Sequence, residues 1–207
     1  MSAVSPARID ELRAALEHKS RVPASKPQWQ PPGLEEFETC KQVLAFDASL
    51  SNVGWVSLRV LADPLRVDVS AKGTIRSVTD QRGFLETWAK AVKVTAALKE
   101  LAYYFALADY VPVESPSVGG GYRTESSLIA GLKVWEEAPA DKRFAVSAQH
   151  VARVLCGDAR IPADRKKQAI RGAVARYIPG SESRSWNEHQ RDAAAVGLTH
   201  LWDRRNR

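Results

Sequence analysis

The sequence predicts an α/β domain built on a mixed β-sheet with helices on its faces. Three short apolar segments, at 43–47, 54–60 and 67–75, are separated by turn signals and are typical of an antiparallel meander. After them, segments with helical spacing of apolar residues alternate with single apolar strands. This order favours a sheet that is antiparallel on one side and parallel on the other.

The later elements follow from the spacing of their apolar residues. Phe84, Trp88 and Val92 recur every fourth residue, as they would on one face of a helix. In chain order we expect a helix over 81–108, a strand at 110–114, a helix over 124–136, a strand at 144–147 and helices over 148–156, 163–177 and 189–203. These elements suffice for one domain.

The first 40 residues differ from the rest of the chain. Apolar residues at helical spacing predict a short amphipathic helix over 6–20, and the prolines of 22–33 indicate a linker or an extended arm. We therefore expect an N-terminal helix and Pro-rich arm over 1–40, followed by one catalytic or binding domain over 41–207.

The charge of the chain favours a polyanionic partner. Its 30 Lys and Arg residues exceed its 24 Asp and Glu residues, for a net charge of +6. Many of the basic residues gather in one stretch: Arg160, Arg165, Lys166, Lys167, Arg171 and Arg176. Such clustering favours nucleic acid over a general contribution to solubility.

Cysteine content and hydropathy exclude several classes of protein. Cys40 and Cys156 lie far apart without ligand spacing, which supports neither a disulfide framework nor a structural zinc site. No segment approaches the roughly 20 apolar residues of a membrane-spanning helix, and the N-terminus lacks a signal-peptide pattern. We expect a cytoplasmic protein, in a bacterium or a phage-infected host, with no membrane partner.

Two acids stand at the ends of predicted strands. Asp47 ends the segment VLAFD, and Glu114 ends YVPVE just before a glycine-rich loop. A carboxylate there is costly to bury unless it is paired or bound to a cation. Taken alone, Asp47 could equally cap the turn that follows it. Two acids at the carboxyl edge of one sheet indicate a site.

A third group lies at the start of the last predicted helix. His189 and Asp192 are three residues apart, which places both side chains on one helix face. In isolation, this pair is better explained by a solvated helix N-terminus that favours an acid. Together with Asp47 and Glu114, it favours a site that holds two Mg²⁺ or Mn²⁺ ions for phosphodiester hydrolysis.

Four segments, in order, resemble the RuvC-type Holliday junction resolvases of the RNase H-like superfamily. FDASLSNVGW resembles their opening strand and turn, and ESPS with the later SSLIAGL resembles their second acid and the helix after it. AQHVARVLCG with ADRKKQAI resembles their basic segment, and HQRDAAAVGLTH resembles their closing acidic helix. The resemblance covers about residues 42–203. It implies an RNase H-like fold and a metal-dependent endonuclease that resolves four-way junctions in branched double-stranded DNA.

The resemblance also implies residue roles. Asp47, Glu114 and Asp192 would be metal ligands, and His189 would be a ligand or a proton-transfer group. Lys166 would lie near the scissile phosphate, although a solvated lysine on an exposed helix is a serious competing interpretation. The residues that we expect to contact DNA are Tyr122, Arg123, Arg153, Arg165, Lys166, Lys167 and Arg171.

The chain departs from the family in two places. Ser117 stands where well-known members carry an aromatic residue that wedges into the junction, and Tyr122 could take over that role. The arm of residues 1–40 has no counterpart in the bacterial enzymes and suggests a diverged phage form.

Three alternative functions are also considered. A branched-DNA or flap nuclease of looser specificity would use the same site. A non-catalytic DNA-binding scaffold is disfavoured because all four candidate ligands are present. An ATPase of the sugar-kinase type needs a duplicated domain, so we expect no nucleotide cofactor.

A resolvase would make two symmetric cuts, which call for a homodimer. The helix over 81–108 and the helix near Leu128 and Leu132 are candidate interfaces.

Overall fold

The computed structural model describes residues 29–115 and 122–207. Within these ranges, five strands form one sheet in the order β3-β2-β1-β4-β5. Strands β1, β2 and β3 pair antiparallel, whereas β4 pairs parallel with both β1 and β5. Their bounds are β1 Val43–Ala48, β2 Asn52–Ala62, β3 Leu65–Arg76, β4 Val111–Ser115 and β5 Arg143–Ser147. The predicted mixed sheet is therefore confirmed.

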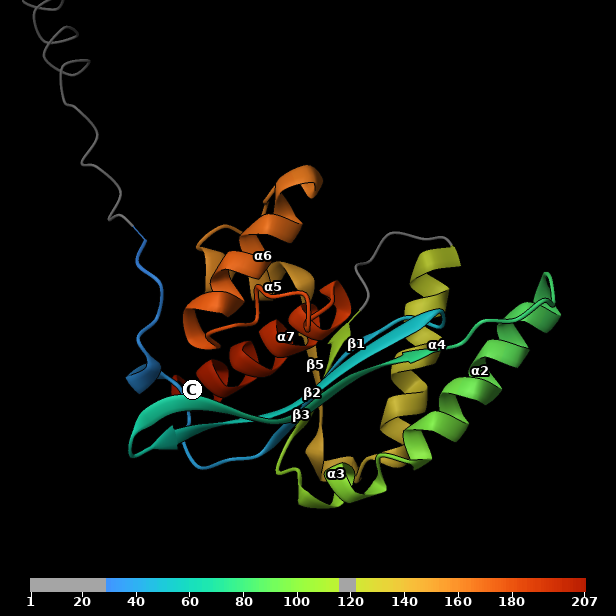
Figure 1. The fold of residues 1–207 in the computed structure, drawn as a ribbon, viewed down its shortest axis with the longest axis horizontal. Helices are drawn as coiled ribbons and strands as arrows, with labels where there is room; N and C mark the ends of the chain where they lie inside the picture. The colour runs from blue at the N-terminus through green and yellow to red at the C-terminus, as the bar shows by residue number, and fades with distance from the viewer. Residues whose placement is uncertain (1–28, 116–121) are drawn as a thin grey trace, which may run out of the picture. The chain divides into compact units, whose positions relative to one another are not determined.

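Helices cover both faces of this sheet (Figure 1). One face carries α2 (Phe84–Lys99), α3 (Ala102–Leu107) and α4 (Tyr122–Glu137), and the other carries α5 (Ala148–Cys156), α6 (Ala163–Tyr177) and α7 (Glu188–Arg205). Two short 3-10 turns, η1 (Leu34–Glu36) and η2 (Ala140–Lys142), complete the described elements. A separate hydrophobic cluster lies between the sheet and each of the two layers of helices.

Helix α7 lies directly against the centre of the sheet. Its residues Ala193–Leu198 are buried, and a Cβ added at Gly197 would stand 3.1 Å from the Cβ of Ala45 on β1. Small side chains permit this close approach because they keep the helix backbone near the strand. The helix therefore brings its first turn to the carboxyl end of β1, where Asp47 lies.

The predicted helix over 81–108 is wrong in one respect, because it is two helices. The chain leaves helical geometry at Leu101, whose φ is −91° and ψ is 10°, between α2 and α3. Leu98, Leu101 and Phe105 are all buried in the cluster under α2 and α4. Both helices thus present apolar residues to the same core, and for this reason the apolar spacing shows no break at the turn.

The compact unit begins at Pro31, earlier than the predicted boundary near residue 41. Phe37 is 1% exposed, and its ring meets Tyr177 edge-on at 5.2 Å between centroids. The Tyr177 hydroxyl donates to the carbonyl of Pro32 at 2.9 Å. Residues 31–40 therefore pack on the domain. The predicted helix over 6–20 lies outside the described residues, and in the described part of the chain no helix is long and apolar enough to cross a membrane.

Candidate active site

Asp47 and Glu114 lie side by side near the carboxyl ends of two neighbouring strands in the middle of the sheet. Their strands, β1 and β4, run parallel and are in register at Phe46 and Val113, the residues just before the two acids. Phe46 and Val113 are buried in the cluster under α2 and α4. Because side chains alternate along a strand, both acids face the opposite side, where α7 packs.

The first turn of α7 is fixed by a capping box at Asn187. The side chain of Asn187 accepts from the backbone N–H of Gln190 at 3.0 Å, and the side chain of Gln190 accepts from the N–H of Asn187 at 3.1 Å. Asn187 also donates to the hydroxyl of Thr74 on β3 at 2.8 Å. The cap therefore joins the start of α7 to the sheet and sets where His189 and Asp192 lie.

His189 is hydrogen-bonded to Asp47. Its Nδ1 lies 2.8 Å from Oδ2 of Asp47, and the two side chains are 34% and 18% exposed. A carboxylate can only accept, so Nδ1 carries the proton in this hydrogen bond, and Nε2 is the ring nitrogen that this contact leaves free. This hydrogen bond, opposed by burial, raises the pKa of His189 above its usual value.

The buried acids Glu114 and Asp192 hold their protons more tightly than free carboxyl groups do. Burial first, and then the charges of Asp47 and Asp192, raise the pKa of Glu114 to about 8. Burial, followed by the charges of Asp47 and Glu188, raises the pKa of Asp192 to about 7. Lys166 lowers both values, but less than burial and the neighbouring acids raise them. Burial and the neighbouring acids therefore both oppose ionisation of Glu114 and Asp192.

A cavity of about 270 Å³, called here the central cavity, opens beside these acids between α5, α6 and α7. Glu114 and Asp192 line it from the sheet and α7, and Lys166 lines it from α6. The remaining lining residues are Ala148, Val151, Lys167, Ile170, Glu188, Ala195 and Val196. The structure therefore brings Lys166 to the two buried acids, although it lies far from both in sequence.

Glu188 is a residue of this cavity that the sequence analysis missed. Its carboxylate pairs with the ammonium of Lys167 at 2.7 Å, from α7 to α6. The only sequence signal is its place directly before His189 in the run EHQRD. Lys167, predicted to contact DNA, thus has an acidic partner at the mouth of the cavity, with its own side chain 73% exposed.

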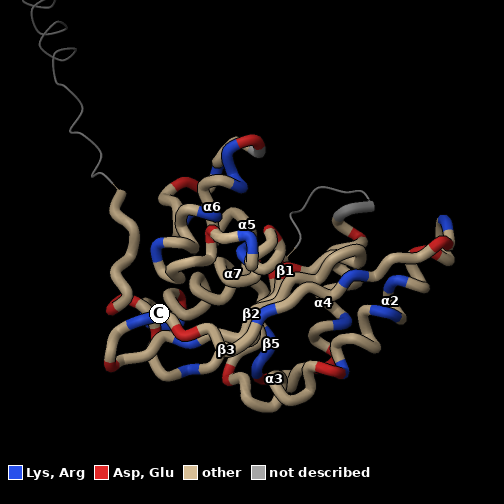
Figure 2. The backbone as a smooth tube through the Cα atoms, in the orientation of Figure 1, with Lys and Arg blue, Asp and Glu red and all other residues tan. Residues whose placement is uncertain are grey.

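The other predicted DNA contacts are spread over the same helices. Lys and Arg positions recur along α6 in Figure 2, where Arg165 is 80% exposed and lies 3.9 Å from Asp164. Arg171, also on α6, donates to the backbone carbonyl of Glu182, and Arg153 is exposed on α5. The side chains of Tyr122 and Arg123, at the start of α4, lie outside the described part of the chain, as does Ser117.

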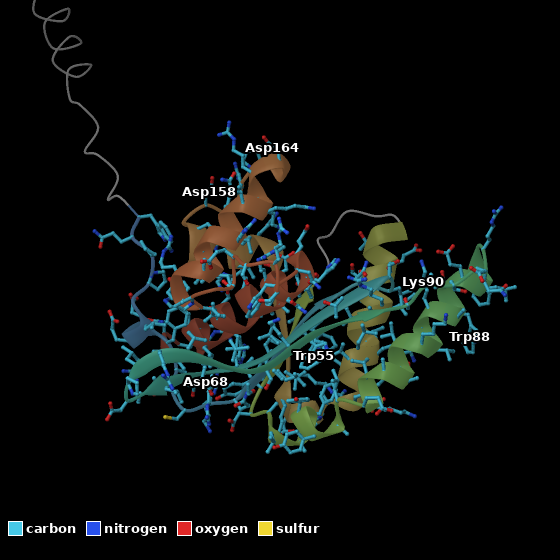
Figure 3. All side chains as sticks on the ribbon, viewed as in Figure 1. Trp55, Asp68, Trp88, Lys90, Asp158 and Asp164 are labelled. Carbon is cyan, nitrogen blue, oxygen red and sulfur yellow. The ribbon has the colours of Figure 1, made fainter. Side chains whose placement is uncertain are left out.

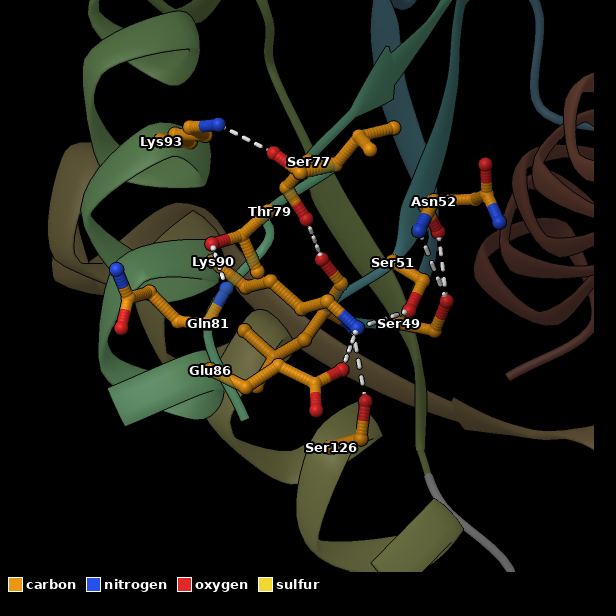
Figure 4. A network of polar contacts seen from close by, with 12 residues as sticks. Ser49, Ser51, Asn52, Ser77, Thr79, Gln81, Glu86, Lys90, Lys93 and Ser126 are labelled. Carbon is orange, nitrogen blue, oxygen red and sulfur yellow. Dashed lines mark hydrogen bonds and ion pairs between the residues drawn. The ribbon is translucent and has the colours of Figure 1, made fainter. Parts of the chain in front are cut away.

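The turn that follows Asp47 is held by three other segments. The backbone N–H of Leu50 donates to the hydroxyl of Ser126 on α4 at 3.0 Å, and Ser77 donates to the carbonyl of Leu50. Lys90 on α2 donates to Ser51 at 3.1 Å and to Glu86 at 2.6 Å (Figure 4). These contacts fix the end of β1, and therefore Asp47, from the side of the sheet opposite α7.

The candidate ligands suit a hard divalent cation in their chemistry. Carboxylate oxygens are the ligands that Mg²⁺ and Mn²⁺ prefer, whereas an imidazole nitrogen is the more usual ligand of later first-row metals. The pKa values of Glu114 and Asp192 are raised by burial and by neighbouring acids, and the charge of such an ion would offset both effects. Among the described residues, however, no three His, Cys, Asp or Glu side chains already stand as a formed metal site. Side chains would need to turn toward a common ion.

Comparison with known proteins identifies the fold. No protein-family model matches the chain, and no curated protein matches it by sequence. Among solved structures, Thermus thermophilus RuvC matches with a TM-score of 0.59 at 18% identity, over 80% of this chain and 96% of that one. The same enzyme in complex with a Holliday junction substrate matches with a TM-score of 0.58 at 19% identity, over 80% and 96% of the two chains.

A third match is the yeast mitochondrial Holliday junction resolvase Ydc2. Its TM-score is 0.50 at 9% identity, over 82% of this chain and 83% of that one. The chain therefore has the RNase H-like fold, as its sequence predicts. Within that fold it has the architecture seen in the RuvC-type resolvases, which its motifs resemble.

Proposed function

We propose that this chain is a metal-dependent endonuclease that resolves four-way DNA junctions by phosphodiester hydrolysis. The proposal is supported by the nearness of the buried acids Glu114 and Asp192 to the hydrogen-bonded pair of Asp47 and His189, on a fold shared with RuvC. The solved complex of Thermus thermophilus RuvC with a Holliday junction substrate supports branched DNA as the partner.

The carboxylates of Asp47, Glu114 and Asp192 would hold the metal, with Nε2 of His189 as a further ligand. When bound, a pair of Mg²⁺ or Mn²⁺ ions supplies an activated water and stabilises the leaving oxygen. The hydrogen bond from His189 to Asp47 orients the imidazole, so Nε2 is the atom that ligates or takes up a proton. This arrangement assigns the chemistry to side chains from β1, β4 and α7.

The lysines of α6 would act on the substrate. Lys166 lines the central cavity beside Glu114 and Asp192, where its charge would offset the charge that develops on the scissile phosphate. Lys167 would exchange Glu188 for a phosphate of the DNA backbone, a contact that positions the strand without reading its sequence.

Cleavage of a substrate panel tests the proposed function. Wild-type protein would be incubated with labelled four-way junction, flap and linear duplex DNA, with Mg²⁺, with Mn²⁺ and with chelator. We expect paired nicks in the junction that require a metal. Equal cutting of flaps would replace the proposal with a branched-DNA nuclease of looser specificity. Junction binding without cutting under either metal would leave a DNA-binding scaffold.

A homodimer is the assembly that fits two symmetric cuts, and an exposed apolar surface is available for it. We define the apolar patch as the large exposed hydrophobic residues of α2 and α4: Phe84, Leu85, Trp88, Val92, Leu128 and Leu132. Phe84 is 80% exposed and Trp88 is 63% exposed, and Figure 3 shows the side chain of Trp88 on α2. Such a patch is typical of a protein interface.

Sedimentation tests this assembly. Wild-type protein is expected to sediment as a dimer, and Trp88→Glu, which places a charge in the apolar patch, as a monomer. Tyr103→Glu is the matched control, because Tyr103 is an aromatic residue that is 68% exposed on α3, outside the patch. A monomeric wild-type protein, or a dimer that survives Trp88→Glu, would rule out this interface.

A further inference from the structure

Arg191 on α7 ties its own helix to the loop that leads into it. This connecting loop, residues 178–187, joins the end of α6 to the start of α7. Nε of Arg191 donates to the carbonyl of Ser181 at 2.7 Å. Nη2 donates to the carbonyl of Ser183 at 2.9 Å and to that of Trp186 at 2.7 Å. One side chain of α7 therefore binds three carbonyl groups of the connecting loop.

The connecting loop depends on such donors because it is a succession of turns and bends. Two of the three residues whose carbonyls Arg191 binds are buried, and a buried carbonyl group without a partner is costly. Arg171 on α6 donates to the carbonyl of Glu182, and Lys72 on β3 donates to that of Ser185 at 2.6 Å. Basic side chains from α6, α7 and β3 thus hold the backbone of the loop.

The last residues of the connecting loop set the first turn of α7. Trp186 directly precedes Asn187, whose capping box and hydrogen bond to Thr74 fix the start of the helix. The backbone N–H of Arg191 donates to the carbonyl of Asn187 at 3.2 Å. The backbone and the side chain of Arg191 therefore both hold the turn that carries the two candidate ligands of α7.

Arg191 differs from the basic residues that would act on the substrate. It lines a polar cavity of about 470 Å³ together with Lys167 and Arg171. The hydrogens of its Nε and Nη2 are nevertheless directed at carbonyl groups of the connecting loop. Lys167, in contrast, pairs with one exposed carboxylate, which a phosphate can replace. The contacts of Arg191 thus favour a role in holding the site over a role in binding DNA.

We propose that Arg191 is a positioning residue for junction cleavage, which keeps His189 and Asp192 at the carboxyl end of β1 by holding the connecting loop. This inference rests on the proposed nuclease function and adds a residue that acts on catalysis without contacting DNA or metal. A guanidinium presents its donors in a fixed planar fork, whereas the ammonium of a lysine is a compact point charge. The shape of the side chain is therefore required as well as its charge.

Arg191→Lys separates shape from charge in the full-length protein. The single-turnover rate of junction cleavage is expected to fall at least about tenfold, because small displacements of reacting groups are costly. The Kd for the junction, measured in chelator, is expected to stay unchanged. Arg143→Lys is the matched control, because Arg143 also donates from Nε and Nη2 to a backbone carbonyl, that of Ala138, at the amino end of β5. It is expected to change neither value.

Arg191→Ala tests the same claim by restoring the missing group from solution. Methylguanidinium, at concentrations far below those that unfold the protein, is expected to restore cleavage, whereas methylammonium has the charge without the fork and is not. Amide hydrogen exchange, without DNA or metal, gives a second measurement. Exchange in the first turn of α7 is expected to be faster in both variants than in the wild-type protein, and methylguanidinium is expected to slow it in Arg191→Ala.

Several outcomes would overturn the positioning role alone. They are a wild-type cleavage rate in Arg191→Lys, a rise in the Kd that accounts for the lost cleavage, and equal rescue by methylammonium. Unchanged exchange at the start of α7, or exchange accelerated equally along the whole chain, would also overturn it. A wild-type protein that cuts no junction would overturn the proposed function and the catalytic role of Arg191 with it.

Discussion

Gly54 lies against the backbone of His189, so closely that a side chain at this position has no space. A Cβ added at Gly54 would stand 2.2 Å from the carbonyl oxygen of His189 and 2.6 Å from its Cβ. Gly54 pairs with Asp47 across β1 and β2. Because Gly54 has no side chain, the first turn of α7 packs closely against the sheet, where His189 is hydrogen-bonded to Asp47.

Gly54→Ala is predicted to displace the start of α7 and separate His189 from Asp47. We expect the free energy of unfolding to fall by about 1–3 kcal/mol, as in other overpacked sites, and junction cleavage to be lost. Gly172→Ala on α6 is the control, because a Cβ there meets nothing within 4 Å. It is expected to stabilise the helix by up to about 1 kcal/mol. Normal cleavage by Gly54→Ala would contradict this account.

The pKa values of Glu114 and Asp192 predict how stability depends on pH and metal. Both are raised above their ordinary values, to about 8 and about 7, so the folded chain binds more protons than the unfolded chain. Without metal, these two groups lower stability as the pH rises from about 4 to about 8. A metal competes with the protons, so Mg²⁺ or Mn²⁺ is predicted to stabilise the protein more at high pH.

Thermal unfolding in chelator and in excess metal measures this effect. The increase in Tm on adding metal is expected to be larger at about pH 8.5 than at about pH 5.5. Asp192→Asn, which removes one of the two groups, is expected to reduce that pH dependence. An equal increase at both pH values would show that the metal does not bind at these carboxyls.

Lys90 is predicted to act on turnover through the turn that follows Asp47. Its side chain is 12% exposed and links Glu86 to Ser51, so Lys90→Met leaves both without this donor. We expect kcat for junction cleavage to fall while the Kd for the junction is unchanged. Lys41→Met is the control, because Lys41 pairs with Asp109 at the surface, with 44% of its side chain exposed. A folded Lys90→Met with wild-type kcat would refute the positioning role.

Phe37 is predicted to stabilise the domain although it precedes the first strand. Phe37→Ala removes the ring contact with Tyr177 and is expected to cost about 3–5 kcal/mol in denaturant unfolding, as for other buried phenylalanines. Trp29→Ala is the control, since Trp29 is 41% exposed and precedes the compact unit. If both variants lowered the free energy of unfolding by a similar small amount, the domain boundary would lie near residue 41 instead.

The strands and the acids at their ends could be predicted because both depend on local pattern. Alternation and turn residues define β1 and β4, and an acid that ends an apolar strand is conspicuous in sequence. The break at Leu101 could not be predicted, because the apolar spacing continues across it. The role of Phe37 was missed because a single apolar residue within EEFE shows no period.

The contacts that complete the site join segments far apart in the chain. Ser126 meets Leu50 across 76 positions, and Lys167 meets Glu188 across 21. Neither pairing has a local signature, because a serine or a lysine on a helix usually faces solvent. Only the packing of α4 and α6 on the sheet brings these side chains to the turn and the cavity.

Single-turnover cleavage of a four-way junction by the wild-type protein, Asp47→Asn and Asp192→Asn tests the central claim most directly. Asp68→Asn is the control, because Asp68 pairs with Arg59 on β2 rather than with the site. The wild-type and control proteins are predicted to make paired, metal-dependent nicks. Both site variants should bind the junction and cut at least about a hundredfold more slowly. Wild-type rates in Asp47→Asn or Asp192→Asn would contradict the assignment of catalysis to this site.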